Sequence, residues 1–351
     1  MPGSSEFPEL CEAVAAAPAV STVGSRTHWE VGGAPPIGAV EVVAPSGVVV
    51  FDPDDLTVTV NAGTTCADLA AVLGARGQEC ALDPRDPAAT VGGVLATGLS
   101  GHRRLRWGPL RDRVLEVRFV TADGRVVKGG GPTVKNVSGF DLPRLLVGSL
   151  GTLGVIARTT LRCQPLPAAS VWCTTALDPF AVRAAVLRPA CIRYDGSTTH
   201  VLLEGETADV AAELATIGGV ECPVPAWPDA PHRGRISVPP AELRPLLDGL
   251  GGRGGLSVPG VEWAAEMGVG TVHVAAATPD ALVGAREAAE TVGGWLLREQ
   301  GAAGIDGFGI ALPNLALMRR IAEAFDPTGK CAPGRLPLVR DPVLVEQSDG
   351  I

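Results

Sequence analysis

The pattern of apolar and polar positions divides the chain near residue 167. Before that point, strand-like stretches of alternating or consecutive apolar and β-branched residues occur at 40–43, 48–51 and 57–61. Two stretches with apolar residues at helical spacing, 8–18 and 66–76, predict helices, and Thr64 or Thr65 can cap the second. Residues 114–121 and 125–128 flank an Ala-Asp-Gly turn and predict a hairpin.

After residue 167 the pattern alternates between strands and helices. Strands are predicted at 171–175, 191–194, 200–205, 220, 235–238, 271–276 and 295–298, and helices at 178–187, 208–216, 240–250 and 279–292. This order favours antiparallel sheets with helices on one face, as in ferredoxin-like modules. A last helix, 313–324, should end before Pro327. The predicted fold class is therefore α+β.

Two glycine-rich segments stand out in the first half, at 90–101 and 148–156. Without a Cβ, glycine lets main-chain N–H groups close around a large anion, so the two segments suggest a cofactor with a diphosphate. The competing interpretation is tight packing turns. No GxGxxG follows a strand, and no GxxxxGK[ST] occurs, which disfavours a Rossmann dehydrogenase and a P-loop ATPase.

Charge and cysteine spacing narrow the possible partners. The net charge of −9, from 29 basic and 38 acidic residues, gives no general attraction to nucleic acid or anionic membranes. The eight cysteines have no metal-binding spacing and are expected to be reduced packing residues. The apolar run at 13–17 follows acidic residues, which is not typical of a secretory signal. We expect a cytoplasmic protein without membrane insertion of its own, associated with membranes only through partner subunits.

The stretch 103–118 is basic although the chain is acidic. It contains six arginines against two acidic residues: Arg103, Arg104, Arg106, Arg111, Arg113 and Arg118 against Asp112 and Glu116. One interpretation is a solvated face with scattered ion pairs. The other is that some of these guanidinium groups face cofactor phosphates or a partner subunit.

Four segments together resemble a known family: Thr-Val-Gly-Gly at 90–93, Trp-Gly-Pro-Leu-Arg-Asp-Arg-Val-Leu at 107–115, the run from Lys135 to Val155, and Phe-Asp-Pro-Thr-Gly-Lys through Pro-Gly-Arg at 325–335. The chain resembles FAD-linked oxidases of the vanillyl-alcohol oxidase and p-cresol methylhydroxylase type, and most of all the smaller FAD-binding subunit of bacterial glycolate oxidase. The resemblance implies an FAD-binding domain of two α+β subdomains at 1–167, a ferredoxin-like cap at 168–300, and a C-terminal helix and tail at 301–351 that pack back on the first domain.

The resemblance also implies the cofactor-binding positions. These are the pyrophosphate loop, the second FAD loop with the Pro that precedes it, and the segment on the adenine or ribose side: Gly24, Ser25, Arg26, Thr27 and His28; Pro84, Thr90, Val91, Gly92, Gly93, Ser100 and Gly101; Val155 and Ile156. Arg26 departs from the family's glycine pattern. Some relatives bind flavin covalently through a histidine where this chain has Thr27, so we expect non-covalent FAD, with His28 as the covalent alternative.

The sequence says less about which residues bind and oxidise the substrate. Oxidation of a 2-hydroxy acid needs a cation for the carboxylate and a base for the hydroxyl proton. The candidates are Arg193, Tyr194, His200 and His273, each of which is equally an ordinary sheet residue, and no catalytic residue is assigned.

The middle region lacks the histidine-rich segment of the family's larger, substrate-oxidising subunits. The prediction is an FAD subunit of a glycolate oxidase-type complex, with a larger flavin subunit and an iron–sulfur subunit as partners. The alternatives are a self-sufficient FAD-dependent oxidase or dehydrogenase of a 2-hydroxy acid or sugar lactone, and a non-redox assembly subunit.

Overall fold

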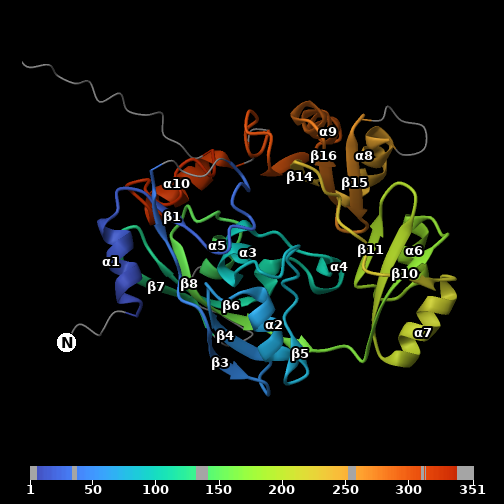
Figure 1. Cartoon of the computed structure of the whole chain (residues 1–351), viewed down its shortest axis with the longest axis horizontal. Helices are drawn as coiled ribbons and strands as arrows, with labels where there is room; N and C mark the ends of the chain where they lie inside the picture. The colour runs from blue at the N-terminus through green and yellow to red at the C-terminus, as the bar shows by residue number, and fades with distance from the viewer. Residues whose placement is uncertain are drawn as a thin grey trace, which may run out of the picture.

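The computed structural model describes residues 6–33, 38–131, 141–251, 258–309, 312 and 314–337. Figure 1 shows two α+β parts side by side, the first formed mainly by the N-terminal half and the second by the region that follows. The final helix, α10 (Leu315–Phe325), returns to the first part. The predicted α+β fold class is confirmed. Among the described helices, none combines the length and the apolar character needed to cross a membrane.

The first part is built on a five-stranded antiparallel sheet in the order β3-β4-β8-β6-β7. Its strands are β3 (Val48–Asp52), β4 (Thr57–Asn61), β6 (Val114–Val120), β7 (Val126–Gly130) and β8 (Val155–Arg162). A parallel pair, β1 (Val20–Thr22) and β2 (Val40–Val42), and a small pair, β5 (Gln78–Glu79) and β9 (Gln164–Pro165), complete the strands of this part. The turn between β6 and β7 contains Gly124 at φ 80°, as the predicted hairpin requires.

Short helices cover this sheet. They are α1 (Pro8–Ala16), α2 (Cys66–Gly74), α3 (Val91–Thr97), α4 (Arg104–Trp107) and α5 (Leu142–Leu146), with a 3₁₀ turn at Leu110–Asp112. Thr65 caps α2 by accepting a hydrogen bond from the Asp68 N–H, as expected for a threonine in this position. The core between helices and sheet includes Leu69, Leu95 and Phe119, and partly buried α10 residues such as Phe325 pack against it.

The second part consists of two βαββαβ units. The first has strands β10 (Ala169–Thr175), β11 (Cys191–Tyr194), β12 (Thr199–Gly205) and β13 (Val220–Glu221), with helices α6 (Pro179–Ala185) and α7 (Thr207–Thr216). The second has strands β14 (His232–Ser237), β15 (Val261–Glu266), β16 (Thr271–Ala276) and β17 (Trp295–Gln300), with helices α8 (Leu243–Leu250) and α9 (Pro279–Thr291). Pairing of β11 with β15 joins them into one sheet, ordered β13-β10-β12-β11-β15-β16-β14-β17. The ferredoxin-like prediction is confirmed.

One face of this sheet carries the helices and the other turns toward the first part (Figure 1). Successive side chains of a strand point to opposite faces of the sheet. Ile236, Val272 and Val274 lie in the core under the helices. Their neighbours Arg235 and His273 therefore lie on the opposite face. Arg103 links the two parts, because its guanidinium contacts Glu79 and Asp83 of the first at 2.6 Å and Glu204 of the second at 3.5 Å.

Two sequence-based expectations differ from the structure. Strand β15 was not anticipated, although it occupies the centre of the eight-stranded sheet. The segment 90–101 is not an open loop, because residues 91–97 form helix α3. Residues 135–140 of the family-like motif and Pro313, the expected start of the last helix, lie outside the described residues.

Candidate functional site

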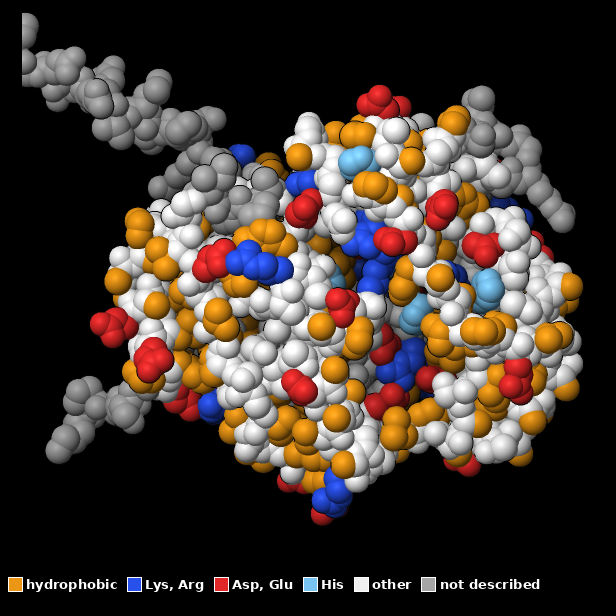
Figure 2. Space-filling view, viewed as in Figure 1, with side chains coloured by type: hydrophobic (Ala, Val, Ile, Leu, Met, Phe, Trp, Pro, Cys, Tyr) orange, Lys and Arg blue, Asp and Glu red, His pale blue; other side chains and the backbone are white. Residues whose placement is uncertain are grey.

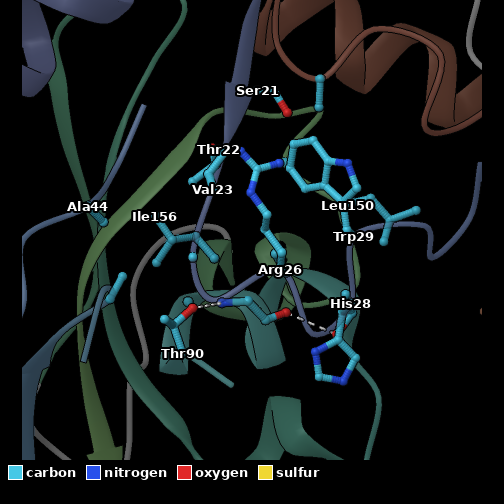
Figure 3. A pocket seen from close by; sticks show the side chains of 18 of the residues that line it. Ser21, Thr22, Val23, Arg26, His28, Trp29, Ala44, Thr90, Leu150 and Ile156 are labelled. Carbon is cyan, nitrogen blue, oxygen red and sulfur yellow. Dashed lines mark hydrogen bonds between the residues drawn. The ribbon is translucent and has the colours of Figure 1, made fainter. Parts of the chain in front are cut away.

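The first cavity lies within the first part, and its lining includes the labelled side chains of Arg26, His28 and Thr90 (Figure 3). It is formed by the loop after β1 (residues 23–29), the start of α3 and the turn before β8. Its empty volume is about 840 Å³, the open mouth included.

The loop after β1 offers main-chain donors to this cavity. No described residue accepts a hydrogen bond from the N–H groups of residues 24–28. Arg26 adopts the left-handed conformation, with φ 60°, in the middle of this run. Consecutive N–H groups around a left-handed residue form a concave binding site for anions. This loop therefore has the geometry expected of a pyrophosphate loop, even though its left-handed residue is not glycine.

The start of α3 is different, and it corrects the expectation that residues 90–93 close on phosphates with free main-chain donors. The Val91 N–H donates to the Thr64 carbonyl at 2.8 Å, and the Gly92 N–H to the Ala62 carbonyl at 2.8 Å. The Gly93 N–H donates to Thr90 Oγ1 at 3.2 Å. Thr90 is thus the N-cap of α3, and all three donors are already used within the protein.

The glycines of these two segments serve packing. A Cβ on Gly92 would lie 2.8 Å from the Ala62 Cβ and 3.0 Å from the Ala62 carbonyl oxygen. A Cβ on Gly24 would lie 2.3 Å from Thr90 Oγ1, so Gly24 allows the loop after β1 to approach the cap of α3. Close contact with Ala62, at the end of β4, is therefore sufficient to require glycine at position 92.

The predicted cofactor positions fall into three groups. The first cavity is lined by Gly24, Ser25, Arg26, Thr27, His28, Thr90, Gly92, Gly93 and Ile156. A second cavity is lined by Thr27, His28, Pro84, Ser100 and Gly101 among others. Val91 and Val155 line neither cavity, and both are buried at 0–1% exposure in the core of the first part. Thr27 and His28 are the predicted positions that the two cavities share.

The first cavity also includes residues that were not singled out as cofactor-binding: Thr22, Trp29, Ala62, Thr97, Leu150, Gly151, Gly154, Ala332 and Arg335. Their signals were present in the sequence as the glycines three apart at 148, 151 and 154 and the Pro-Gly-Arg at 333–335. Arg335 is buried and donates to the Val31 carbonyl at 3.1 Å. Burial lowers the pKa of Arg335 to about 10, so it remains a cation at neutral pH.

The second cavity lies between the two parts of the molecule. Its empty volume is about 1,260 Å³, including its mouth. The first part contributes Arg85, and β14 and β16 of the second contribute Arg233, Arg235 and His273. Arg235 and His273 are direct cross-strand partners. In Figure 2, Lys and Arg side chains gather in the hollow between the two parts. The lining also carries Asp83, Asp86, Asp229 and Glu299, and Asp229 pairs with Arg233 at 2.9 Å. An anionic ligand is therefore suited to the side of the cavity near Arg85 and Arg235.

Two buried titratable groups stand next to these cations. The His273 Nε2 lies 3.5 Å from Glu266 Oε1, and Arg85 lies 3.3 Å from the His273 Nδ1. Burial raises the pKa of Glu266 to about 8, although Arg235 and Arg104 oppose this shift. Burial, and then the charge of Arg85, lower the pKa of His273. The histidine is therefore neutral at pH 7, and its Nδ1 is the nitrogen that accepts from Arg85.

His28 stands at the junction of the two cavities. Burial lowers its pKa, while Glu299 on the opposite wall raises it. Its Nδ1 lies 3.0 Å from Thr27 Oγ1.

Of the four substrate-side candidates, His273 alone lines the second cavity. Arg193 is buried behind it and donates to the Pro225 and Ala226 carbonyls. The Tyr194 hydroxyl donates to the Gly196 carbonyl at 2.7 Å. His200 lies 3.4 Å from Asp195. The structure thus places Arg193, Tyr194 and His200 outside the cavity lining.

The cysteines are free, and six of the eight are buried. The described residues contain no cluster of three or more His, Cys, Asp or Glu side chains arranged to hold a metal.

Comparison with known families defines the class of the first part. Residues 8–130 match the family model described as "FAD binding domain". This stretch contains the loop after β1, the start of α3 and the sheet edge that wall the first cavity. The chain is therefore an FAD-binding protein, and the FAD prediction is confirmed.

Curated relatives agree with the resemblance noted in the sequence. The chain is 34% identical over 190 residues to the "Glycolate oxidase subunit GlcE" of Escherichia coli, which covers 52% of this chain and 54% of that protein. It is 42% identical over 114 residues to a "D-lactate dehydrogenase" of Archaeoglobus fulgidus, covering 32% of this chain and 26% of that protein. The chain thus spans about half the length of the first relative and about a quarter of the second.

Solved structures support the fold over nearly the whole chain. An alkyldihydroxyacetonephosphate synthase superimposes with a TM-score of 0.67 at 15% identity, covering 94% of this chain and 76% of that protein. A second crystal form of the same enzyme gives a TM-score of 0.65 and covers 93% of this chain. At this identity the likeness concerns the fold alone.

The residues of the first cavity fit FAD. The loop at residues 24–28 has unused donors for phosphate oxygens, and Arg335 supplies a buried positive charge. Ala62, Leu150 and Ile156 supply apolar walls for the remainder of the dinucleotide.

Proposed function

We propose that this chain is the FAD-binding subunit of a 2-hydroxy acid oxidoreductase complex of the glycolate oxidase type. The observation that carries the proposal is that two cavities meet at His28. One has free main-chain donors suited to a diphosphate, and the other contains Arg235, whose guanidinium has no carboxylate partner among the described residues and suits a substrate carboxylate. The relative described as a glycolate oxidase subunit supports the same class of reaction.

The proposed division of labour follows the two parts of the chain. Residues 1–167 form the FAD-binding domain, residues 168–300 form a cap that closes the substrate side, and residues 301–351 return to the first domain. We assign cofactor contacts to residues 24–28 through their main chain. Thr90, Gly92 and Gly93 hold the shape of the wall, because their donors and glycine positions are used in packing.

When bound, FAD supplies the acceptor for the hydride from C2 of a 2-hydroxy acid. In the second cavity, Arg235 has no hydrogen-bond acceptor or carboxylate partner among the described residues, so it is the guanidinium available to hold a substrate carboxylate. Neutral His273 has its Nδ1 turned to Arg85, which leaves the Nε2–H facing Glu266. The pair is suited to holding a proton away from water.

The partners belong to the same proposal. We propose that electrons leave through a larger flavin subunit and an iron–sulfur subunit, as the resemblance to the glycolate oxidase subunit implies. Any association with membranes would then occur through these subunits, with this chain in the cytoplasm.

The test is the flavin content of the purified chain. A folded chain should carry about one FAD with the yellow absorption of flavin, and acid precipitation should release that FAD into the supernatant because it is held non-covalently. Folded protein without flavin would contradict the proposal. Flavin that stays in the acid pellet would instead indicate covalent attachment, with His28 as the residue to substitute.

One observation favours a second candidate, a self-sufficient dehydrogenase. The second cavity is already lined by Arg235, which has no partner among the described residues, and by His273, and Arg235 can hold the carboxylate of a 2-hydroxy acid in this chain alone. Reduction of a dye by the isolated chain with glycolate or D-lactate would support this candidate. The absence of dye reduction by the isolated chain, together with activity in the reconstituted complex, would support the subunit role.

A further inference from the structure

A third cavity, here called the arginine cavity, is separate from the lining of the FAD cavity except at Thr97 and Leu150. It has an empty volume of about 740 Å³, its mouth included. The first part supplies Arg104 on α4, Arg111 in the 3₁₀ turn and Arg144 on α5, and the second supplies Arg235 on β14. Four of the arginines of this acidic chain therefore face one space.

Most of this positive charge has no partner. Arg144 is neutralised by Asp112 at 2.9 Å and Asp141 at 3.0 Å. In contrast, the described residues provide no hydrogen-bond acceptor and no carboxylate within 4.0 Å for Arg104, Arg111 or Arg235. Among the residues that the structure describes, no aspartate or glutamate lines the arginine cavity. Three guanidinium groups without a direct carboxylate partner among the described residues thus face the arginine cavity.

The arginines form a series from the mouth to the base. Arg111 is exposed, Arg104 is half-buried and Arg235 is only 8% exposed, with its Nε buried and without a partner. Burial lowers the pKa of Arg104 and of Arg235. The charge of Glu266 opposes this shift at Arg104 and the charge of Glu299 opposes it at Arg235, whereas repulsion from Arg111 and from Arg104, respectively, adds to it. Leaving a buried charge unpaired is strongly unfavourable, whereas an anion bound between these groups removes the penalty.

The opposite wall of the arginine cavity is apolar. It includes Leu110, Val147 and Leu150, and the stacked rings of Trp295 and Phe308, whose centroids are 5.9 Å apart. A free inorganic anion would leave this wall in contact with water. The wall instead suits the carbon skeleton of an organic ligand.

Arg235 connects this space to the proposed substrate site, because it lines both the second cavity and the arginine cavity. A ligand whose carboxylate is held by Arg235 can extend a second charged group toward Arg104 and Arg111. Glycolate, with a single carboxylate, has no second charged group for Arg104 and Arg111.

We propose that the arginine cavity binds an organic dianion, so that the ligand is a 2-hydroxy acid carrying a second anionic group, either a carboxylate or a phosphate. The assignment of this ligand as a substrate rests on the proposed function, whereas its binding does not. The two sources of the second charge share the same recognition by paired guanidinium groups.

The experiment is calorimetric titration of the full chain, as purified, with three probes. D-2-hydroxyglutarate carries a second carboxylate, D-3-phosphoglycerate carries a phosphate, and glycolate carries a single negative charge. We expect at least one dianion to bind about ten-fold or more tightly than glycolate, equivalent to about 1.4 kcal/mol. The dianion that binds more tightly shows whether the second anionic group of the ligand is a carboxylate or a phosphate.

Variants locate the binding. Arg104→Gln and Arg111→Gln should each weaken the dianion about ten-fold and leave glycolate unchanged. Arg125→Gln removes the same charge from an arginine that is 77% exposed and paired with Asp123 on the β6–β7 hairpin, and should change neither affinity. Arg111 is exposed, so its variant serves even where Arg104→Gln impairs folding.

Equal affinities for the three probes, or a dianion preference that persists in both variants, would overturn the proposal. The proposed function is tested separately, by the flavin content of the chain and by dye reduction. A chain without flavin that still shows the Arg111-dependent preference would retain the dianion site and lose the redox role.

Discussion

Two segments of the first part, the loop at residues 24–28 and the start of α3 at residues 90–93, both line the first cavity but use their main-chain N–H groups differently. Both contain small residues and were predicted to surround cofactor phosphates. In the structure, the N–H groups of the first segment have no acceptor among the described residues. The N–H groups of the second segment donate hydrogen bonds to Thr64, Ala62 and Thr90. Glycine in a cofactor-binding domain can therefore indicate either an anion site or the close packing that supports one, and only the hydrogen bonds distinguish the two.

Amide hydrogen exchange gives the most direct test of this difference and its largest expected effect. With FAD at about 100 times its Kd, exchange of the N–H groups of residues 24–28 should slow about 100-fold, or ~2.7 kcal/mol. Exchange at Val91 and Gly92 should be slow with and without FAD, because both donate to main-chain carbonyls. Mass spectrometry with peptide-level resolution measures both segments in one experiment.

The proposed difference between the segments would be wrong if FAD slowed amide exchange equally in both, or if it slowed exchange more at residues 91–92. Either result would mean that the start of α3 rearranges to donate to the cofactor.

Gly92→Val tests the packing role of the second segment. The new side chain would overlap with the Ala62 Cβ and carbonyl, so we expect a loss of about 2 kcal/mol in the free energy of unfolding of the flavin-free chain. Urea denaturation measures this loss. FAD retention should decrease only as far as folding does.

Gly74→Val is the matched control, because no atom lies within 4 Å of a Cβ at this exposed end of α2. It should change the free energy of unfolding by no more than about 0.5 kcal/mol. A Gly92→Val chain with unchanged stability but without flavin would restore the phosphate-contact interpretation.

The same pair of segments shows what the sequence could reveal. Strand and helix positions followed from periodicity, because half-buried strands such as β4 and amphipathic helices such as α9 repeat at their own periods. Helix α3 was missed because two glycines at its start obscure a helical pattern, although Thr90 is a suitable N-cap residue. Strand β15 follows a glycine-rich stretch, and its buried Glu266 contradicts the usual pattern of a central strand.

The substrate side was beyond sequence reasoning for a geometric reason. Arg85 and His273 are in contact at 3.3 Å but lie 188 residues apart in the chain. Arg193 and His273 both occur on strands with alternating patterns, and only the packing of residues 225–226 over Arg193 separates the buried arginine from the cavity-lining histidine. Such long-range neighbours cannot be found from local periodicity.

Gly24→Ala probes the contact between the two segments. Its Cβ would meet Thr90 Oγ1 at 2.3 Å, and Thr90 would have to turn away from the Gly93 N–H that it caps. Loss of this cap costs about 1 kcal/mol. Thr90→Ala should cost a similar amount alone, and much less when added to Gly24→Ala.

A double-mutant cycle by urea denaturation measures this coupling, expected at about 1 kcal/mol. Strictly additive effects of the two substitutions would show that the loop and the cap of α3 are independent. The interpretation of Gly24 as a packing glycine would then be wrong.

Arg26→Gly is the substitution with the smallest expected effect, and it asks whether the loop at residues 24–28 acts through its main chain alone. Arg26 holds φ 60°, which costs a non-glycine residue about 1–2 kcal/mol, so glycine relieves strain. The gain is offset by the loss of an exposed ion pair with Glu41 at 2.5 Å and by the greater freedom of glycine in the unfolded chain. We expect the free energy of unfolding to change by no more than about 0.5 kcal/mol and the Kd for FAD, measured by flavin fluorescence, to stay within about two-fold, because the N–H groups remain in place.

Arg26→Val keeps the strain, adds a β-branched side chain and should weaken FAD binding. A ten-fold weaker affinity in Arg26→Gly would instead show that the guanidinium itself holds the cofactor.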